Sequence, residues 1–128
     1  FFELSAVASG GAIGAVLRFM ISRSETLTSA KLPLPWATLL VNILGCFFIG
    51  LTAGLLQKND SHYAIRIFLI PGILGGFTTY SAFAFESYNL FRQENPVMAC
   101  VYMFLTLALG LCAVAVGSYL VNTPSVSN

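Results

Sequence analysis

The sequence predicts an all-α membrane protein with four transmembrane helices, the third of which is broken mid-membrane. Two observations predict the membrane helices: a composition too poor in charge for a water-facing surface, and four apolar segments of membrane-spanning length. The break is predicted from the sequence of the third segment. Of the 128 residues, 57% are hydrophobic and 9% are charged, whereas about 25% are charged in an ordinary soluble domain. Most of the surface must therefore face lipid. The net charge of +1 offers no basic patch, so nucleic acid is not an expected partner.

Each predicted helix has the length that a bilayer requires, about 20 mostly apolar residues. The first contains one charge, Arg18, the third contains Arg66 and Glu86, and the other two contain none. The first is expected to be a retained helix, because Arg18 stands where the cleavage region of a signal peptide is small and neutral. The chain forms a single domain, residues 1–128, with spans at about 4–22, 35–56, 65–91 and 97–121.

The Lys and Arg residues near the ends of the spans are nearly balanced between the two sides of the membrane. Lys58 and Arg66 lie on one side, and Arg23, Lys31 and Arg92 lie on the other. Because the Lys/Arg bias of short loops sets orientation, a chain without a bias can insert both ways up. An antiparallel, dual-topology homodimer then becomes possible, although so few charges can also balance by chance.

Small residues recur at one-turn spacing on the first two spans. Ala6, Gly10 and Gly14 form one seam, and Gly50 and Gly54 form another. Such seams let helices approach closely. Since four helices of this length bury little surface alone, self-association is expected.

The third span carries the sequence PGILGGFTTYSAF over residues 71–83. Pro71 cannot donate a hydrogen bond, and the three glycines constrain the backbone little, so the helix is expected to break here. In hydrocarbon, the freed peptide groups must be buried in protein or line a cavity, as in transporters whose broken helices hold ions. A packing kink is the alternative, but Thr78, Thr79 and Ser81 beside the break favour an ion site.

Uncharged polar side chains recur on the second and fourth spans. Asn42 follows Thr38 by one turn, and Thr106 follows Tyr102 by one turn, with Gly110 next in line but without a hydroxyl. These groups donate hydrogen bonds without carrying charge, which suits a small anion, since conduction requires binding that is favourable yet escapable. The alternative for Asn42 is interhelical bonding worth about 1 kcal/mol.

Aromatic and sulfur-containing residues complete the inventory. Three aromatic rings, those of Phe77, Tyr80 and Phe83, lie near the break. Ring edges carry partial positive charge that can receive an anion. The alternative is that these rings only pack against other helices or contact lipid. Cys46, Cys100 and Cys112 stand in apolar stretches without a CxxC pair or a His cluster. All three are expected to be small core residues and not metal ligands.

The stretch GGFTTYSAF at 75–83, the GxxxR pattern at Gly14–Arg18 and the VN pair at Val41–Asn42 resemble the Fluc (CrcB-like) family of fluoride channels. The resemblance covers the whole chain. It implies an antiparallel, dual-topology homodimer with two fluoride pores. It also implies a structural sodium ion at the dimer centre, held by main-chain carbonyls of Gly75 and Thr78 from both copies, and no organic cofactor.

The resemblance also assigns roles to individual residues. The family's paired pore phenylalanines fall on Tyr80 and Phe83, where Tyr80 departs from the usual Phe. Arg18 matches an arginine of the aqueous vestibule, and Glu86 matches a carboxylate without an assigned role. A hydroxyl expected at Gly110 is missing. The implied fluoride pore comprises Asn42, Phe83, Tyr80, Ser81, Thr79, Tyr102, Thr106 and Thr38.

The expected function is passive export of cytoplasmic fluoride through a multi-pass protein of the inner (plasma) membrane, with fluoride, lipid and a second copy as partners. The sequence carries no ATP-binding motif and no catalytic constellation, so an enzyme or pump is not predicted. The main rival is a proton-coupled exporter of the small multidrug-resistance type. That type depends on a glutamate within the first helix, where this chain has only Glu3 at the start. A non-transporting assembly subunit is the third possibility.

Overall fold

The computed structural model describes residues 1–24, 27, 31–56 and 62–122, and these residues form helices without any strand. Four helices in this part of the chain are long and apolar enough to cross a membrane, which confirms the all-helical, four-span prediction. Lys58, which entered the charge balance, lies outside the described residues. The spans are α1 (Phe2–Ser22), α3 (Trp36–Leu56), the composite third span Tyr63–Arg92, and α7 (Pro96–Asn122).

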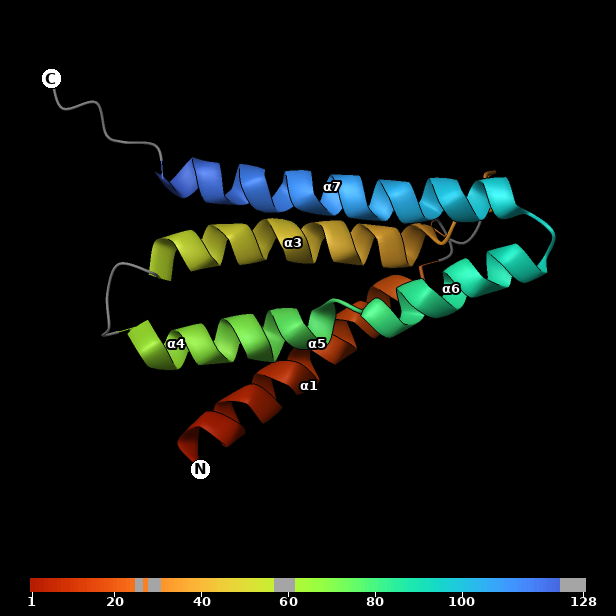
Figure 1. The fold of residues 1–128 in the computed structure, drawn as a ribbon. Helices are drawn as coiled ribbons and strands as arrows, with labels where there is room; N and C mark the ends of the chain where they lie inside the picture. Colours follow the sequence, from red (N-terminus) through yellow and green to blue (C-terminus); the bar gives the residue numbers. More distant parts are fainter. Residues whose placement is uncertain (25–26, 28–30, 57–61, 123–128) are drawn as a thin grey trace, which may run out of the picture.

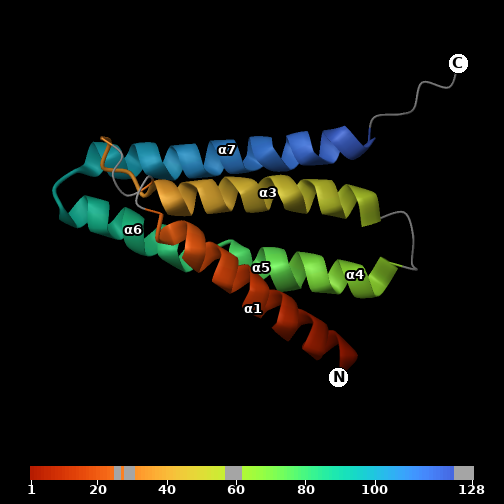
Figure 2. The same ribbon diagram turned by 180° about the vertical axis from the view of Figure 1, so that it is seen from behind.

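The helices form two packed pairs. Helices α3 and α7 lie side by side along their length, and α1 crosses the third span (Figures 1 and 2). Glycines permit the close approach of α3 and α7, because a Cβ on Gly50 would overlap the carbonyl of Val114 and one on Gly117 would overlap that of Phe47. Helix α1 starts, and α7 ends, at the same end of the bundle (Figure 1).

The crossing of α1 over the third span also depends on glycine. A Cβ on Gly10 would lie 2.5 Å from the carbonyl oxygen of Phe68, and one on Gly14 would lie 2.8 Å from the amide nitrogen of Phe77. Gly54 likewise faces Val121 on α7. The glycine seams are therefore filled by the chain's own helices, and they give no independent support for a second copy.

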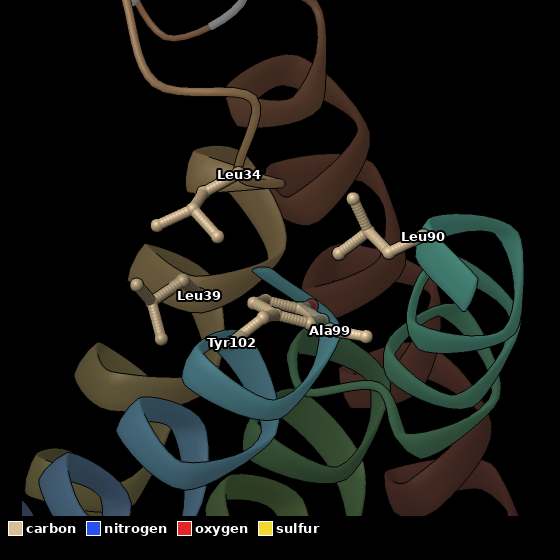
Figure 3. Packing of buried hydrophobic residues seen from close by; sticks show 5 residues of the cluster. All are labelled: Leu34, Leu39, Leu90, Ala99 and Tyr102. Carbon is tan, nitrogen blue, oxygen red and sulfur yellow. The ribbon is translucent and has the colours of Figure 1, made fainter. Parts of the chain in front are cut away.

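A small core closes one end of the bundle. Buried side chains from the segment before α3, from α3, from α6 (Tyr80–Arg92) and from α7 meet there (Figure 3). The members are Leu34, Leu39, Leu90, Ala99 and Tyr102. Elsewhere large apolar side chains point outward; Phe104 is 70% exposed and Leu111 is 64% exposed, as expected where the surrounding solvent is lipid.

The third span consists of four pieces: α4 (Tyr63–Ile67), the π-helix η2 (Phe68–Leu74), α5 (Gly75–Phe77) and α6. Pro71 lies inside η2 and does not end it. Extended backbone occurs instead at Thr78 (φ −77°, ψ 157°) and Thr79 (φ −148°, ψ 119°). The chain thus changes direction between α5 and α6, where Figure 1 shows a short non-helical link.

Candidate functional site

The extended residues between α5 and α6 are held by the side chain of Asn42 on α3. The amide N–H of Thr79 donates to Asn42 Oδ1 at 2.9 Å, and Asn42 Nδ2 donates to the carbonyl of Thr79 at 3.2 Å. The carboxamide therefore pairs with both peptide groups of Thr79, as a neighbouring peptide would. Nδ2 carries two hydrogens, and this pair uses one of them.

Thr79 in turn begins α6. Its Oγ1 accepts from the amide of Ala82 at 3.2 Å and lies 3.3 Å from Ser81 Oγ. A threonine in this position satisfies one of the free amides of the first helical turn. The N-terminal end of α6, which favours negative charge, thus starts at the link itself.

The amides of Thr79 and Ala82 donate to side chains and not to the carbonyls that a continuous helix would offer them. In an unbroken α-helix the carbonyl of Gly75 would accept from Thr79 and that of Thr78 from Ala82. Those amides donate to Asn42 Oδ1 and Thr79 Oγ1 instead. The carbonyls of Gly75 and Thr78 therefore lack their usual partners, and carbonyl oxygens are ligands that suit Na⁺ at an unwound helix. Within the described ranges no three His, Cys, Asp or Glu side chains gather into a metal site.

A groove of about 630 Å³ opens beside this link. It is bounded by α3, η2, α5, α6 and α7. The predicted pore residues that line it are Asn42, Thr79, Tyr80, Phe83 and Thr106, and the predicted sodium ligands Gly75 and Thr78 line it as well. It is also lined by Gly110, which continues the line of Tyr102 and Thr106 without a hydroxyl, and by Cys46, which nothing in the sequence placed in the pore.

Three aromatic rings run inward from this groove. The rings of Tyr80 and Phe83 have centroids 5.9 Å apart and are tilted by 53°, and those of Phe83 and Tyr102 are 5.5 Å apart and tilted by 47°. Tyr80 is 80% exposed, whereas Tyr102 is fully buried. The row therefore leads from the surface of the chain to its polar interior.

Glu86 lies at the inner end of the row, where α3, α6 and α7 meet. Thr38 Oγ1 donates to Glu86 Oε1 at 2.7 Å, and the hydroxyl of Tyr102 donates to Oε2 at 2.8 Å. Thr106 Oγ1 donates to the carbonyl of Tyr102 at 2.8 Å. The sequence placed these hydroxyls on the right helices but gave no sign that two of them share one carboxylate, because that contact joins three separate helices.

Four predicted site residues, Thr38, Ser81, Tyr102 and Glu86, do not line the groove. Arg18 does not line it either; it lies on α1, half-buried, without an ion pair or hydrogen bond to any residue that the structure describes. An arginine in this setting is free to face an aqueous opening.

Comparison with known proteins gives the relationships of the chain. The sequence profile of the CrcB-like protein, Camphor Resistance (CrcB) family matches residues 5–118. The chain belongs to the CrcB family. It is 42% identical over 112 residues to the fluoride-specific ion channel FluC of Rhizobium johnstonii, covering 87% of this chain and 89% of that relative. The same-named channel of Desulfotalea psychrophila is 38% identical over 115 residues, covering 90% and 88%.

These CrcB-family relatives are named as ion channels, which are not enzymes. A third, from Bacteroides fragilis, is 36% identical over 120 residues, covering 92% of this chain and 94% of its own. Together with the four apolar helices, they make the chain a multi-pass membrane protein, of the plasma membrane in bacteria.

Proposed function

We propose that this CrcB-family chain is a passive, fluoride-selective channel whose ion path follows the groove beside Thr78 and Thr79. The observation that carries the proposal is the lining of that groove, which offers neutral hydrogen-bond donors and aromatic rings but no charged side chain. Relatives that share about 40% of its residues are named as fluoride-specific channels. A proton-coupled exporter is not favoured, because Glu3 lies at the start of α1 and accepts a hydrogen bond from the hydroxyl of Tyr63 at 2.7 Å.

The donors of the groove match a small anion. Asn42 Nδ2 keeps one N–H, and α6 begins nearby with an N-terminal end that favours negative charge. The hydroxyl of Thr106, which donates to the carbonyl of Tyr102, would rotate to donate to the anion instead. Donors of this kind replace part of a hydration shell without trapping the ion. Fluoride accepts stronger hydrogen bonds than chloride and is smaller, so a narrow path lined by such donors selects it.

The groove is open on one side, and a second copy would close it. Tyr80 and Gly75 are exposed beside the groove. An antiparallel partner inserted the other way up would cover both, and the near balance of Lys and Arg between the two ends permits that arrangement. The dimer would then hold two equivalent pores, with the link at Thr78 and Thr79 near mid-membrane.

A sodium ion at the centre of that dimer would be bound by the carbonyls of Gly75 and Thr78 from both copies. The diversion of their helical donors supports this role, because each carbonyl then needs another electropositive partner in a site without water. The ion would supply fixed positive charge that holds the two copies together. Arg18 would contribute positive potential at the aqueous entrance.

Transport needs no energy source beyond the membrane potential. From an acidic medium, fluoride enters cells as neutral hydrofluoric acid. It ionises in the less acidic interior and is trapped there as the anion. A potential that is negative inside then drives it outward with about 2.3 kcal/mol per charge for each 100 mV. A selective pore is sufficient to lower the internal concentration.

The test is fluoride release from liposomes that contain the purified protein, followed with a fluoride electrode and compared with chloride release. We expect rapid release of fluoride and none of chloride. Thr106→Val removes one donor from the groove and should slow release about threefold to tenfold, the value of one hydrogen bond. Thr52→Val is the matched control, since Thr52 bonds the carbonyl of Phe48 and does not line this groove. Release of chloride at the same rate as fluoride, or no release at all, would end the proposal.

A further inference from the structure

Two rows of side chains face each other where α3 and α7 pack. On α3 the residues are Thr38, Asn42 and Cys46, at one-turn spacing; on α7 they are Tyr102, Thr106 and Gly110. The register between the helices is fixed at both ends. Thr38 and Tyr102 share Glu86 at one end, and Cys46 lies against Gly110 at the other.

The third level of this arrangement differs from the first two. There a thiol faces a residue with no side chain, and both residues line the groove. A Cβ added to Gly110 would make only ordinary contact, 3.5 Å from Cys46 Sγ. By contrast, a Cβ on Gly117 of the same helix would lie 2.9 Å from the amide nitrogen of Leu51. Helix packing therefore requires glycine at position 117 and does not require it at position 110.

Cys46 and Gly110 lie together on the wall of the groove. Cys100 and Cys112 differ in this respect, since neither lines the groove, although both are exposed on α7. The three cysteines, which the sequence suggested were alike, are thus in different settings.

We propose that the ion path runs along the groove past Cys46 and Gly110, and that the Cys46 thiol is the hydrogen-bond donor to the anion at this level. This inference rests on the proposed fluoride channel and names a residue that sets how tightly the ion is held. A thiol is a weaker donor than a hydroxyl. The anion is therefore held more loosely here than beside Thr106, which favours its escape from this end of the path.

The first experiment uses a Cys100→Ala/Cys112→Ala protein in liposomes, treated with methyl methanethiosulfonate and analysed by mass spectrometry. We expect Cys46 to be methylthiolated and fluoride release to fall at least about tenfold, because Cys46 lines the groove and the added group would obstruct it. In a Cys46→Ala/Cys100→Ala protein, whose only thiol is Cys112, the reagent should modify Cys112 without changing that variant's own rate of release. Unchanged release after full modification of Cys46 would overturn the inference, and so would a conducting protein whose Cys46 resists the reagent.

A second experiment needs no reagent. Cys46→Ala should lower fluoride release about twofold to threefold, the lower end of the value of one hydrogen bond. Gly110→Ser in that variant places a hydroxyl at the same level of the groove and should restore release, which a merely structural role of the thiol does not predict. Absence of rescue overturns the donor role. A wild-type protein that releases no fluoride refutes the channel itself, and the two failures are therefore distinguishable.

Discussion

Replacing Asn42 by leucine removes the side chain that holds the link between α5 and α6, while keeping nearly the same shape. Two hydrogen bonds are lost, at 2.9 and 3.2 Å. The Thr79 residue that loses them is only 8% exposed, so water cannot replace the amide. Each orphaned polar group costs about 1–3 kcal/mol, and Asn42→Leu should therefore lower the free energy of unfolding by about 2–6 kcal/mol.

The assay is reversible unfolding in mixed micelles, by titration with sodium dodecyl sulfate, followed by far-ultraviolet circular dichroism. Asn122→Leu is the matched control, because Asn122 is exposed and donates to Ser118 on its own helix at 3.2 Å. It should change the free energy of unfolding by less than about 0.5 kcal/mol. If Asn42→Leu lowers the free energy of unfolding no more than that control does, Thr79 does not depend on the carboxamide and the reasoning fails.

Three further changes test the neighbouring contacts. Gly14→Ala forces a Cβ against the carbonyl of Ile73 and should lower the free energy of unfolding by about 1–3 kcal/mol in the same titration; Gly110→Ala, with ordinary contacts, should not. Glu86→Gln presents an NH2 group to one of the two hydroxyls that donate to the carboxylate, so that hydroxyl must turn round to accept and the contact is weakened; fluoride release should fall about tenfold in the liposome assay, and release at the wild-type rate would show that the carboxylate is dispensable. Thr79→Val removes the cap of α6 and should cost about 1 kcal/mol in unfolding, whereas Thr79→Ser, which keeps the hydroxyl, should cost less; equal losses would refute the capping role.

Hydropathy alone was sufficient to find the four spans, because the need to cover a lipid-facing surface acts on every residue of a helix. The third span shows where such reasoning ends. Pro71 and the glycines indicated a break, yet the helix continues through Pro71 as a π-helix and the extended residues are Thr78 and Thr79. Their position depends on Asn42, a partner on another helix that local sequence cannot reveal.

The glycine seams and the hydroxyls were limited in the same way. One-turn spacing identifies a face that can approach a neighbour, but it does not name the neighbour, and Gly10 and Gly50 proved to contact the chain's own helices. Spacing likewise placed Thr38 and Tyr102 on their helices, without showing that both would meet Glu86.

The π-helix η2, residues Phe68–Leu74, has a consequence for how the chain tolerates change in length. A π turn contains one residue more than an α turn, so it is equivalent to a single-residue insertion that the fold has absorbed. Deleting one residue there would return the segment to α geometry and rotate everything before it by about 100° relative to everything after it. Thr78 and Thr79 could then no longer face Asn42 while the first part of the third span kept its contact with α1. We expect natural variants of this chain to gain or lose residues in the connectors between the spans more often than within η2.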